Sequence, residues 1–101
     1  MVYNDDYNPE GIKVFEEKNA IPILFYLFEH GSCRKMDLYR DVTRNYRVPE
    51  VLEMMENRGM IHQEQVSGKR DSVIISLTDT GRDIVDHLNY IEGVLTKDSA
   101  L

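Results

Sequence analysis

Few residues in this sequence are of types that could carry out chemistry. Cys33 is the only cysteine, and the charges of Arg34 and Lys35 beside it could stabilise a thiolate in a redox sensor. We favour the alternative, a small buried apolar residue. Asp83 and His87 are four positions apart and could bind a metal from one helix face, but they are an incomplete ligand set, so we predict no metal site. The sequence contains no GxSxG, HExxH or glycine-rich phosphate motif, so we expect neither an enzyme nor a cofactor.

Positive charge is concentrated in two short segments of an acidic chain. The 101 residues include 18 acidic and 12 basic side chains, and the net charge of −6 argues globally against polyanion binding. Residues 32–47 nevertheless carry a net +3 and residues 67–77 a net +1. The cations of these two segments are Arg34, Lys35, Arg40, Arg44, Arg47, Lys69 and Arg70. Clustered cations of this kind neutralise phosphates, so the distribution keeps nucleic acid as a candidate partner.

The elements that must position these cations follow from periodicity and turn residues. Residues 1–9 indicate an irregular arm, after which Pro9 opens a short helix that runs to Glu17. Asn19 is the predicted N-cap of a second helix, which ends at Gly31. Residues 34–42 and 48–58 predict two further short helices, separated by the polar turn 43–47.

The period then changes from helix to strand. Residues 60–66 and 72–77 predict two strands joined by the polar loop 67–71, a hairpin with a basic tip. Thr78 or Asp79 caps a last helix that runs to about Leu95, and residues 96–101 are predicted to be a flexible tail. Two short helices joined by a tight turn form a helix-turn-helix, and a hairpin directly after them forms a wing.

This ordered set resembles the winged helix-turn-helix transcriptional regulators of bacteria and archaea, of the broad MarR, PadR and HxlR-like kind. The resemblance covers residues 20–95, and its most specific part is the sequence Leu77-Thr78-Asp79-Thr80-Gly81-Arg82, which opens a helix after the wing. It implies an α+β, mostly α fold, in which a three-helix core and a β-hairpin wing, with a long C-terminal helix, form one domain over residues 10–95. It also implies sequence-specific binding to double-stranded DNA, with the helix around residues 45–58 in the major groove.

The resemblance assigns a role to each polar residue near that helix. Asn45, Tyr46, Arg47 and Glu50 would face base edges, with Arg47 on a guanine and Asn45 on an adenine. Thr43, Arg44 and Tyr46 are candidates for phosphate contacts, and Arg34, Lys35 and Arg40 would lie near the DNA backbone. Lys69 and Arg70 would reach phosphate or the minor groove from the wing tip.

The sequence departs from the family pattern at two points. Pro49 is expected to move the start of the recognition helix to about Val48, which leaves residues 45–47 in a turn. Glu50, Glu53 and Glu56 recur at every third position, and facing DNA they would repel phosphates, although Glu50 could accept from a cytosine amino group. The alternative is therefore a winged-helix module that recognises proteins and has no DNA affinity.

The last helix, residues 79–95, carries an apolar seam made of Ile84, Leu88, Ile91 and Leu95 at spacings of 4, 3 and 4. One interpretation is that this face packs only on its own domain. The other, which we favour, is that it also forms a homodimer. The N-terminus lacks the pattern of a signal peptide and no apolar run is long enough to span a membrane, so we expect a cytoplasmic protein. The sequence does not indicate a small-molecule effector.

Overall fold

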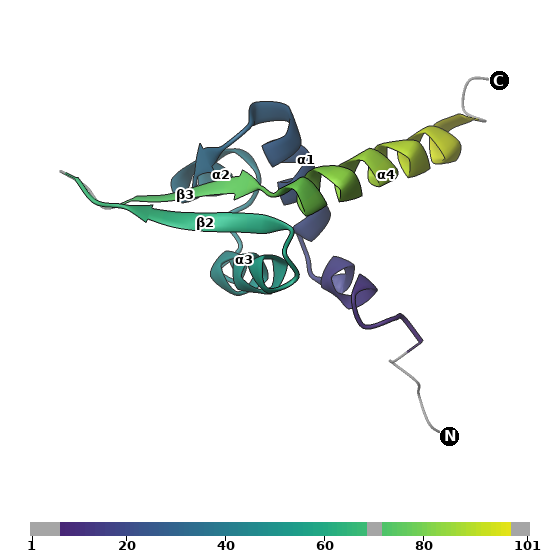
Figure 1. Ribbon diagram of the computed structural model, residues 1–101, viewed down its shortest axis with the longest axis horizontal. Helices are drawn as coiled ribbons and strands as arrows, with labels where there is room; N and C mark the ends of the chain where they lie inside the picture. Colours follow the sequence, from purple (N-terminus) through teal and green to yellow (C-terminus); the bar gives the residue numbers. More distant parts are fainter. Residues whose placement is uncertain (1–6, 69–71, 98–101) are drawn as a thin grey trace.

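Four α-helices, one short 3-10 helix and three strands make up the part of the chain that the structure, a computed structural model, describes, which is residues 7–68 and 72–97. In chain order these are η1 (Ile12–Glu16), α1 (Ala20–His30), β1 (Cys33–Arg34), α2 (Lys35–Asp41), α3 (Val48–Asn57), β2 (Ile61–Val66), β3 (Ser72–Leu77) and α4 (Asp79–Thr96). The β2–β3 hairpin projects from one end of the molecule, and the C-terminal half of α4 projects from the other (Figure 1). The predicted α+β winged helix-turn-helix is confirmed.

Turn residues set the ends of the helices, in one case by a different mechanism from the one predicted. Asn19 precedes α1, but its side chain makes no capping hydrogen bond. Its backbone is left-handed, with φ 76° and ψ 0°, and the Ala20 N–H donates to the Glu17 carbonyl across a turn. Asparagine tolerates this conformation better than most residues do. The short helix predicted from Pro9 is also shorter than expected, because regular structure begins only at Ile12.

The end of α3 is a Schellman motif. Gly59 takes a φ of 76°, its N–H donates to the Glu56 carbonyl, and the Met60 N–H donates to the Met55 carbonyl. Met55 and Met60 are both buried, which supplies the apolar contact that accompanies this motif. The chain therefore turns sharply from α3 into β2, and the wing keeps a fixed direction relative to the recognition helix.

The sheet has three antiparallel strands in the order β1-β3-β2. The sequence predicted the hairpin, and in it Ile61 pairs with Leu77 and Val66 with Ser72. The sequence predicts no further strand, but Cys33 pairs with Ile75, which makes β1 a third strand. This pairing joins the start of α2 to the base of the wing.

One apolar core lies where the helices meet the base of the sheet. It joins side chains of α1, α2, α3 and the sheet with Val14 of η1 and Val85 of α4. Its large, fully buried members are Ile23, Leu24, Leu27, Leu38, Val48, Leu52, Met55, Met60, Ile61, Ile75 and Val85. Ile84 and Leu88 pack against this core from α4 and are partly buried. Burial at this scale is the main source of the domain's stability.

The first turn of α4 is fixed on the turn that follows α3. The Thr78 Oγ1 accepts the Gly81 N–H at 3.0 Å, as an N-cap should, and the same hydroxyl donates to the Gly59 carbonyl. The Thr78 N–H donates to the Met60 carbonyl at 3.1 Å. Gly81 is buried directly against that carbonyl. The contacts of the Leu-Thr-x-x-Gly segment with Gly59 and Met60 thus set the direction in which α4 leaves the domain.

Candidate nucleic-acid interface

The turn that leads into α3 is ordered by its own side chains. The Thr43 Oγ1 accepts the Asn45 N–H at 3.1 Å, and the Asn45 Oδ1 accepts the Arg47 N–H at 2.8 Å. The helix begins at Val48 with Pro49 in its first turn, so residues 45–47 precede the helix, as Pro49 predicts. The side-chain oxygen of Asn45 therefore already accepts one hydrogen bond in this turn, and its amide nitrogen is the donor that it could offer to a base.

Arg47 is held by two carboxylates. Its Nη2 lies 3.0 Å from the Glu17 Oε1 and 3.2 Å from the Glu50 Oε2. Glu50 is in the first turn of α3, where a carboxylate also interacts favourably with the positive end of the helix dipole. No sequence pattern indicates the Glu17 contact, because the two residues are 30 positions apart and belong to different elements.

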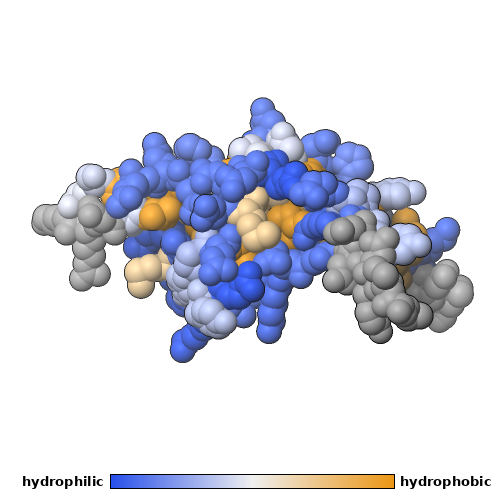
Figure 2. Space-filling view, turned by 90° about the horizontal axis from the view of Figure 1, so that it is seen from below, coloured by the Kyte–Doolittle hydropathy of each residue, from blue (hydrophilic) through white to orange (hydrophobic). Residues whose placement is uncertain are grey.

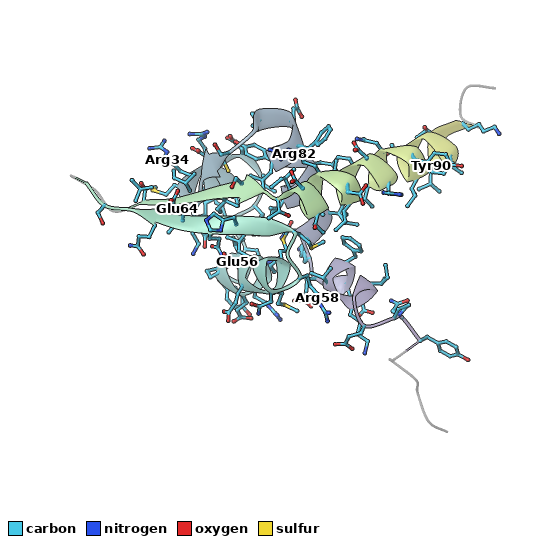
Figure 3. All side chains as sticks on the ribbon, in the orientation of Figure 1. Arg34, Glu56, Arg58, Glu64, Arg82 and Tyr90 are labelled. Atoms are coloured by element: carbon cyan, nitrogen blue, oxygen red, sulfur yellow. The ribbon has the colours of Figure 1, made fainter. Side chains whose placement is uncertain are left out.

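The outward face of α3 carries acids and no cation. Its exposed residues are Pro49, Glu50, Glu53, Met54 and Asn57, and the face of the molecule below the sheet is mainly hydrophilic (Figure 2). Glu56 plays a different part, because its two oxygens accept the backbone N–H and the side-chain amide of Gln63, each at 3.1 Å. It lies between α3 and β2 (Figure 3) and ties the wing to the recognition helix. Only Glu53 among the three regularly spaced glutamates has neither a hydrogen bond nor an ion pair with the described residues.

The predicted backbone-contacting cations around α2 are mostly paired with acids. Arg34 and Arg40 lie 3.5 and 3.2 Å from the Asp37 Oδ1. The Arg40 guanidinium also donates twice to Asp41, at 2.8 and 2.9 Å, and the Tyr26 hydroxyl donates to the same carboxylate at 2.7 Å. These bonds hold the pKa of Asp41 well below its usual range. Arg34 and Arg40 are exposed, but each reaches a phosphate only in competition with a carboxylate.

Some of the other residues predicted to contact DNA are not paired with acids. Arg44 and Tyr46 are exposed, and within residues 7–68 and 72–97 neither Arg44 nor Lys35 forms an ion pair. Lys35 lines a hollow of about 410 Å³ between the start of α2 and the wing, together with Arg34, Met36, Tyr39, Gln65, Ser72 and Val73. Lys69 and Arg70, the predicted wing-tip contacts, lie outside the described residues.

Cys33 does not have the environment of a reactive thiol. Its exposed fraction is 9%, and burial, followed by the charges of Asp37 and Asp41, raises its pKa to about 11. In the alternative that we did not favour, the neighbouring cations stabilise a thiolate, but the nearby acids and the buried position oppose it. The interpretation of Cys33 as a small apolar residue is therefore the one the structure supports.

The apolar seam of α4 divides into two parts. Ile84 and Leu88 pack on the domain's own core, whereas Ile91 and Leu95 are 48% and 75% exposed. Tyr90 and Val94 extend the exposed part, and Tyr90 lies on the section of α4 that projects from the body (Figure 3).

Asp83 and His87 are 3.7 Å apart on the same helix, and no three His, Cys, Asp or Glu side chains of the described residues could hold a metal together. No helix in the described ranges is long and apolar enough to cross a bilayer.

No protein-family model and no curated protein sequence matches the chain, but solved structures do. A protein described as a MarR-family transcriptional regulator from Enterococcus faecalis V583 superposes with a TM-score of 0.74 at 22% identity, covering 98% of this chain and 100% of that one. A second, from Porphyromonas gingivalis W83, gives 0.71 at 20% identity over 91% and 93% of the two chains. Reduced AbfR bound to DNA gives 0.59 at 21% identity over 90% of this chain and 76% of that one. At such identities the likeness establishes the winged-helix fold, and function must be argued from the surface.

Proposed function

We propose that this protein is a DNA-binding transcriptional regulator. Its α3 lies in the major groove, and its wing lies on the backbone or in the minor groove. The observation that carries the proposal is the arrangement at the amino end of α3, where Arg44 and Tyr46 are exposed in the turn before the helix and Arg47 is half exposed. The helix N-terminus adds the partial positive charge of its dipole at the same place. The fold shared with DNA-bound AbfR supports this docking geometry.

The assignment of contacts follows from this arrangement. Arg44 and Tyr46, with Thr43, take phosphates, and Lys35 reaches the backbone beside Arg34 and Arg40. Arg47 and Glu50 are the side chains nearest to base edges, where arginine suits guanine and a carboxylate suits the cytosine amino group. The Asn45 amide nitrogen remains a candidate donor to a base. Lys69 and Arg70 supply the charge of the wing, and reversing both charges is expected to abolish binding to all sequences.

A homodimer is part of the proposal. The exposed part of the α4 seam, which includes Ile91 and Leu95, projects beyond the domain, and a second copy of the same helix would cover it. Two recognition helices in a two-fold dimer would lie about 34 Å apart and would read a palindrome. A cytoplasmic location is also part of the proposal.

The second candidate function is a protein-recognition module, which the outward face of α3 favours. That face presents Glu50 and Glu53 to the space where DNA would lie. DNA affinity must therefore come from the few cations at its margin and should fall steeply with salt. A protein-binding module would have no salt-dependent affinity for DNA, and this difference separates the two functions.

The test is fluorescence anisotropy with random-sequence duplex DNA at about 50 and 200 mM salt, beside sedimentation of the free protein. We expect a dimer whose affinity falls roughly 10³-fold over this range if six or more phosphates are contacted. Arg44→Glu should weaken binding at least about tenfold and lower the salt slope by about one. Lys97→Glu makes the same charge change at the far end of α4 and should have little effect. A wild-type protein that binds no duplex at about 50 mM salt would overturn the proposal and favour the protein-recognition module.

A further inference from the structure

Two arginines bracket α3, and both contact the same N-terminal segment. Arg47 immediately precedes the helix and contacts Glu17, and Arg58 immediately follows it and contacts Glu10 at 3.1 Å. We call residues 10–17, which contain η1, the N-terminal strap. Figure 3 shows Arg58 at the end of α3 that faces η1. The strap therefore lies along α3 and is tied to it at both ends.

The ion pair at the amino end of α3, Glu17–Arg47, is less exposed to solvent than the pair at the carboxyl end, Glu10–Arg58. The Glu17 side chain is 23% exposed, whereas that of Glu10 is 78% exposed. Glu17 also opens the turn that ends in the left-handed Asn19, so its backbone position is fixed by the start of α1. The carboxylate is thus placed in advance beside Arg47 and meets its guanidinium at low entropic cost.

The atoms that form the contact determine what Arg47 can still do. Both Glu17 and Glu50 contact the same nitrogen, Nη2. A guanidinium presents parallel N–H pairs along two edges, Nη1 with Nη2 and Nε with Nη2, and both edges include that nitrogen. A two-bond contact with guanine O6 and N7 needs one of these edges. The Nη2 atom carries two N–H groups, one on each edge, and the hydrogen bond to Glu17 uses one of them. The Glu50 oxygen lies 3.2 Å from the same nitrogen, so in this conformation a guanine that approached either edge would bring its O6 or N7 close to a carboxylate oxygen.

We propose that Glu17 is a specificity-determining residue of this surface, because its carboxylate occupies one paired N–H edge of Arg47 and thereby keeps guanine from it. The inference rests on the proposed DNA-binding function and adds to it the residue that limits base reading. While Glu17 holds Arg47, the protein binds DNA mainly through backbone charge. A paired guanine contact through the occupied edge must first replace the Glu17 contact. The free energy lost in breaking that contact reduces the preference for guanine that Arg47 can supply.

The experiment compares Glu17→Gln with Glu16→Gln, which removes the same charge one position away. Glu16 accepts a hydrogen bond from Asn8, and among the described residues no hydrogen bond or ion pair joins it to Arg47. Anisotropy is measured with two duplexes of equal length, one of alternating G·C and one of alternating A·T base pairs, at about 50 mM salt. We expect Glu17→Gln to raise the ratio of G·C to A·T affinity about fivefold or more, the lower end for one paired arginine–guanine contact. Glu16→Gln should leave the ratio within about twofold of the wild-type value.

Two further variants separate base reading from a structural effect. Glu17→Gln in an Arg47→Gln background should change the ratio no more than Glu16→Gln does, because the side chain that it releases is gone. Glu10→Gln weakens the other tie of the strap and should also leave the ratio unchanged. A purely structural role for Glu17 would instead lower the melting temperature and alter both affinities alike.

The outcomes distinguish this inference from the function on which it rests. If all variants bind both duplexes and Glu17→Gln behaves as Glu16→Gln does, the inference is wrong and the DNA-binding function stands. If the wild-type protein and every variant fail to bind either duplex, the proposed function is wrong and the inference falls with it.

Discussion

Replacing Gly81 by alanine should destabilise the domain, although alanine is the better helix former. A Cβ at this position would lie 2.1 Å from the Met60 carbonyl oxygen and 3.0 Å from a methyl carbon of Leu77. Ordinary contact begins at 3.4 Å, so the oxygen would have to move by at least 1.3 Å. That oxygen belongs to the backbone of a buried residue and accepts the Thr78 N–H at 3.1 Å. It cannot move without disturbing the bond that joins α4 to the end of α3.

The size of the expected change in the free energy of unfolding follows from three opposing contributions. Alanine gains about 1 kcal/mol over glycine in a helix interior. Overpacking of this kind costs about 1–3 kcal/mol, and losing the Thr78 hydrogen bond costs about 1 kcal/mol more. We therefore expect the free energy of unfolding to fall by about 2 kcal/mol.

Urea unfolding followed by circular dichroism, at one fixed protein concentration, measures this change. For a domain of this size the midpoint should fall by roughly 1–2 M urea. Gly93→Ala is the matched control on the same helix, because it is exposed and a Cβ there meets nothing within 4 Å. It should raise the free energy of unfolding by about 0.5–1 kcal/mol. A Gly81→Ala variant as stable as wild type would refute the packing account of the Leu-Thr-x-x-Gly segment.

Two further predictions concern Cys33 and Asn19. Because burial raises the pKa of Cys33 from 9.0 to about 11, its thiolate fraction at pH 8 should be about 10²-fold below that of an exposed cysteine, and its reaction with a chromogenic disulfide correspondingly slower. The unfolded chain loses this proton first, so the stability linked to it is present below pH 9 and declines as the pH rises from 9 towards 11. Because the hydrogen bond to Asp41 also raises the pKa of Tyr26, Cys33→Ala should keep part of the decline, and urea titrations should show a steeper decline in the wild type than in this variant. At Asn19, whose φ is 76°, glycine should change the free energy of unfolding by less than about 0.5 kcal/mol, whereas alanine should lower it by about 1 kcal/mol. Equal stability of these two variants would contradict the role given to the left-handed turn.

The order of elements could be predicted because each depended on local signals. Each signal can be recognised from a few neighbouring residues: the apolar stripe of Leu52 and Met55, the turn at Gly59, and the change of period at Met60. Pro49 correctly placed residues 45–47 before the recognition helix. The same local reasoning failed at Asn19, because a side chain suited to capping is equally suited to a left-handed backbone, and only the packed turn decides between them.

The electrostatics of the candidate site depended on tertiary structure. By itself, the sequence determined a winged helix-turn-helix with two basic segments and an acidic recognition helix, since charge and periodicity are properties of the chain. Which cations are paired was decided by folding: Arg47 meets Glu17 from 30 positions away, and Arg58 meets Glu10 from 48. Glu56 likewise looked like one of three phosphate-repelling acids until its bonds to Gln63 placed it between helix and wing. Such contacts join residues that are distant in the chain, so no local pattern encodes them, and they determine which charges remain available to a partner.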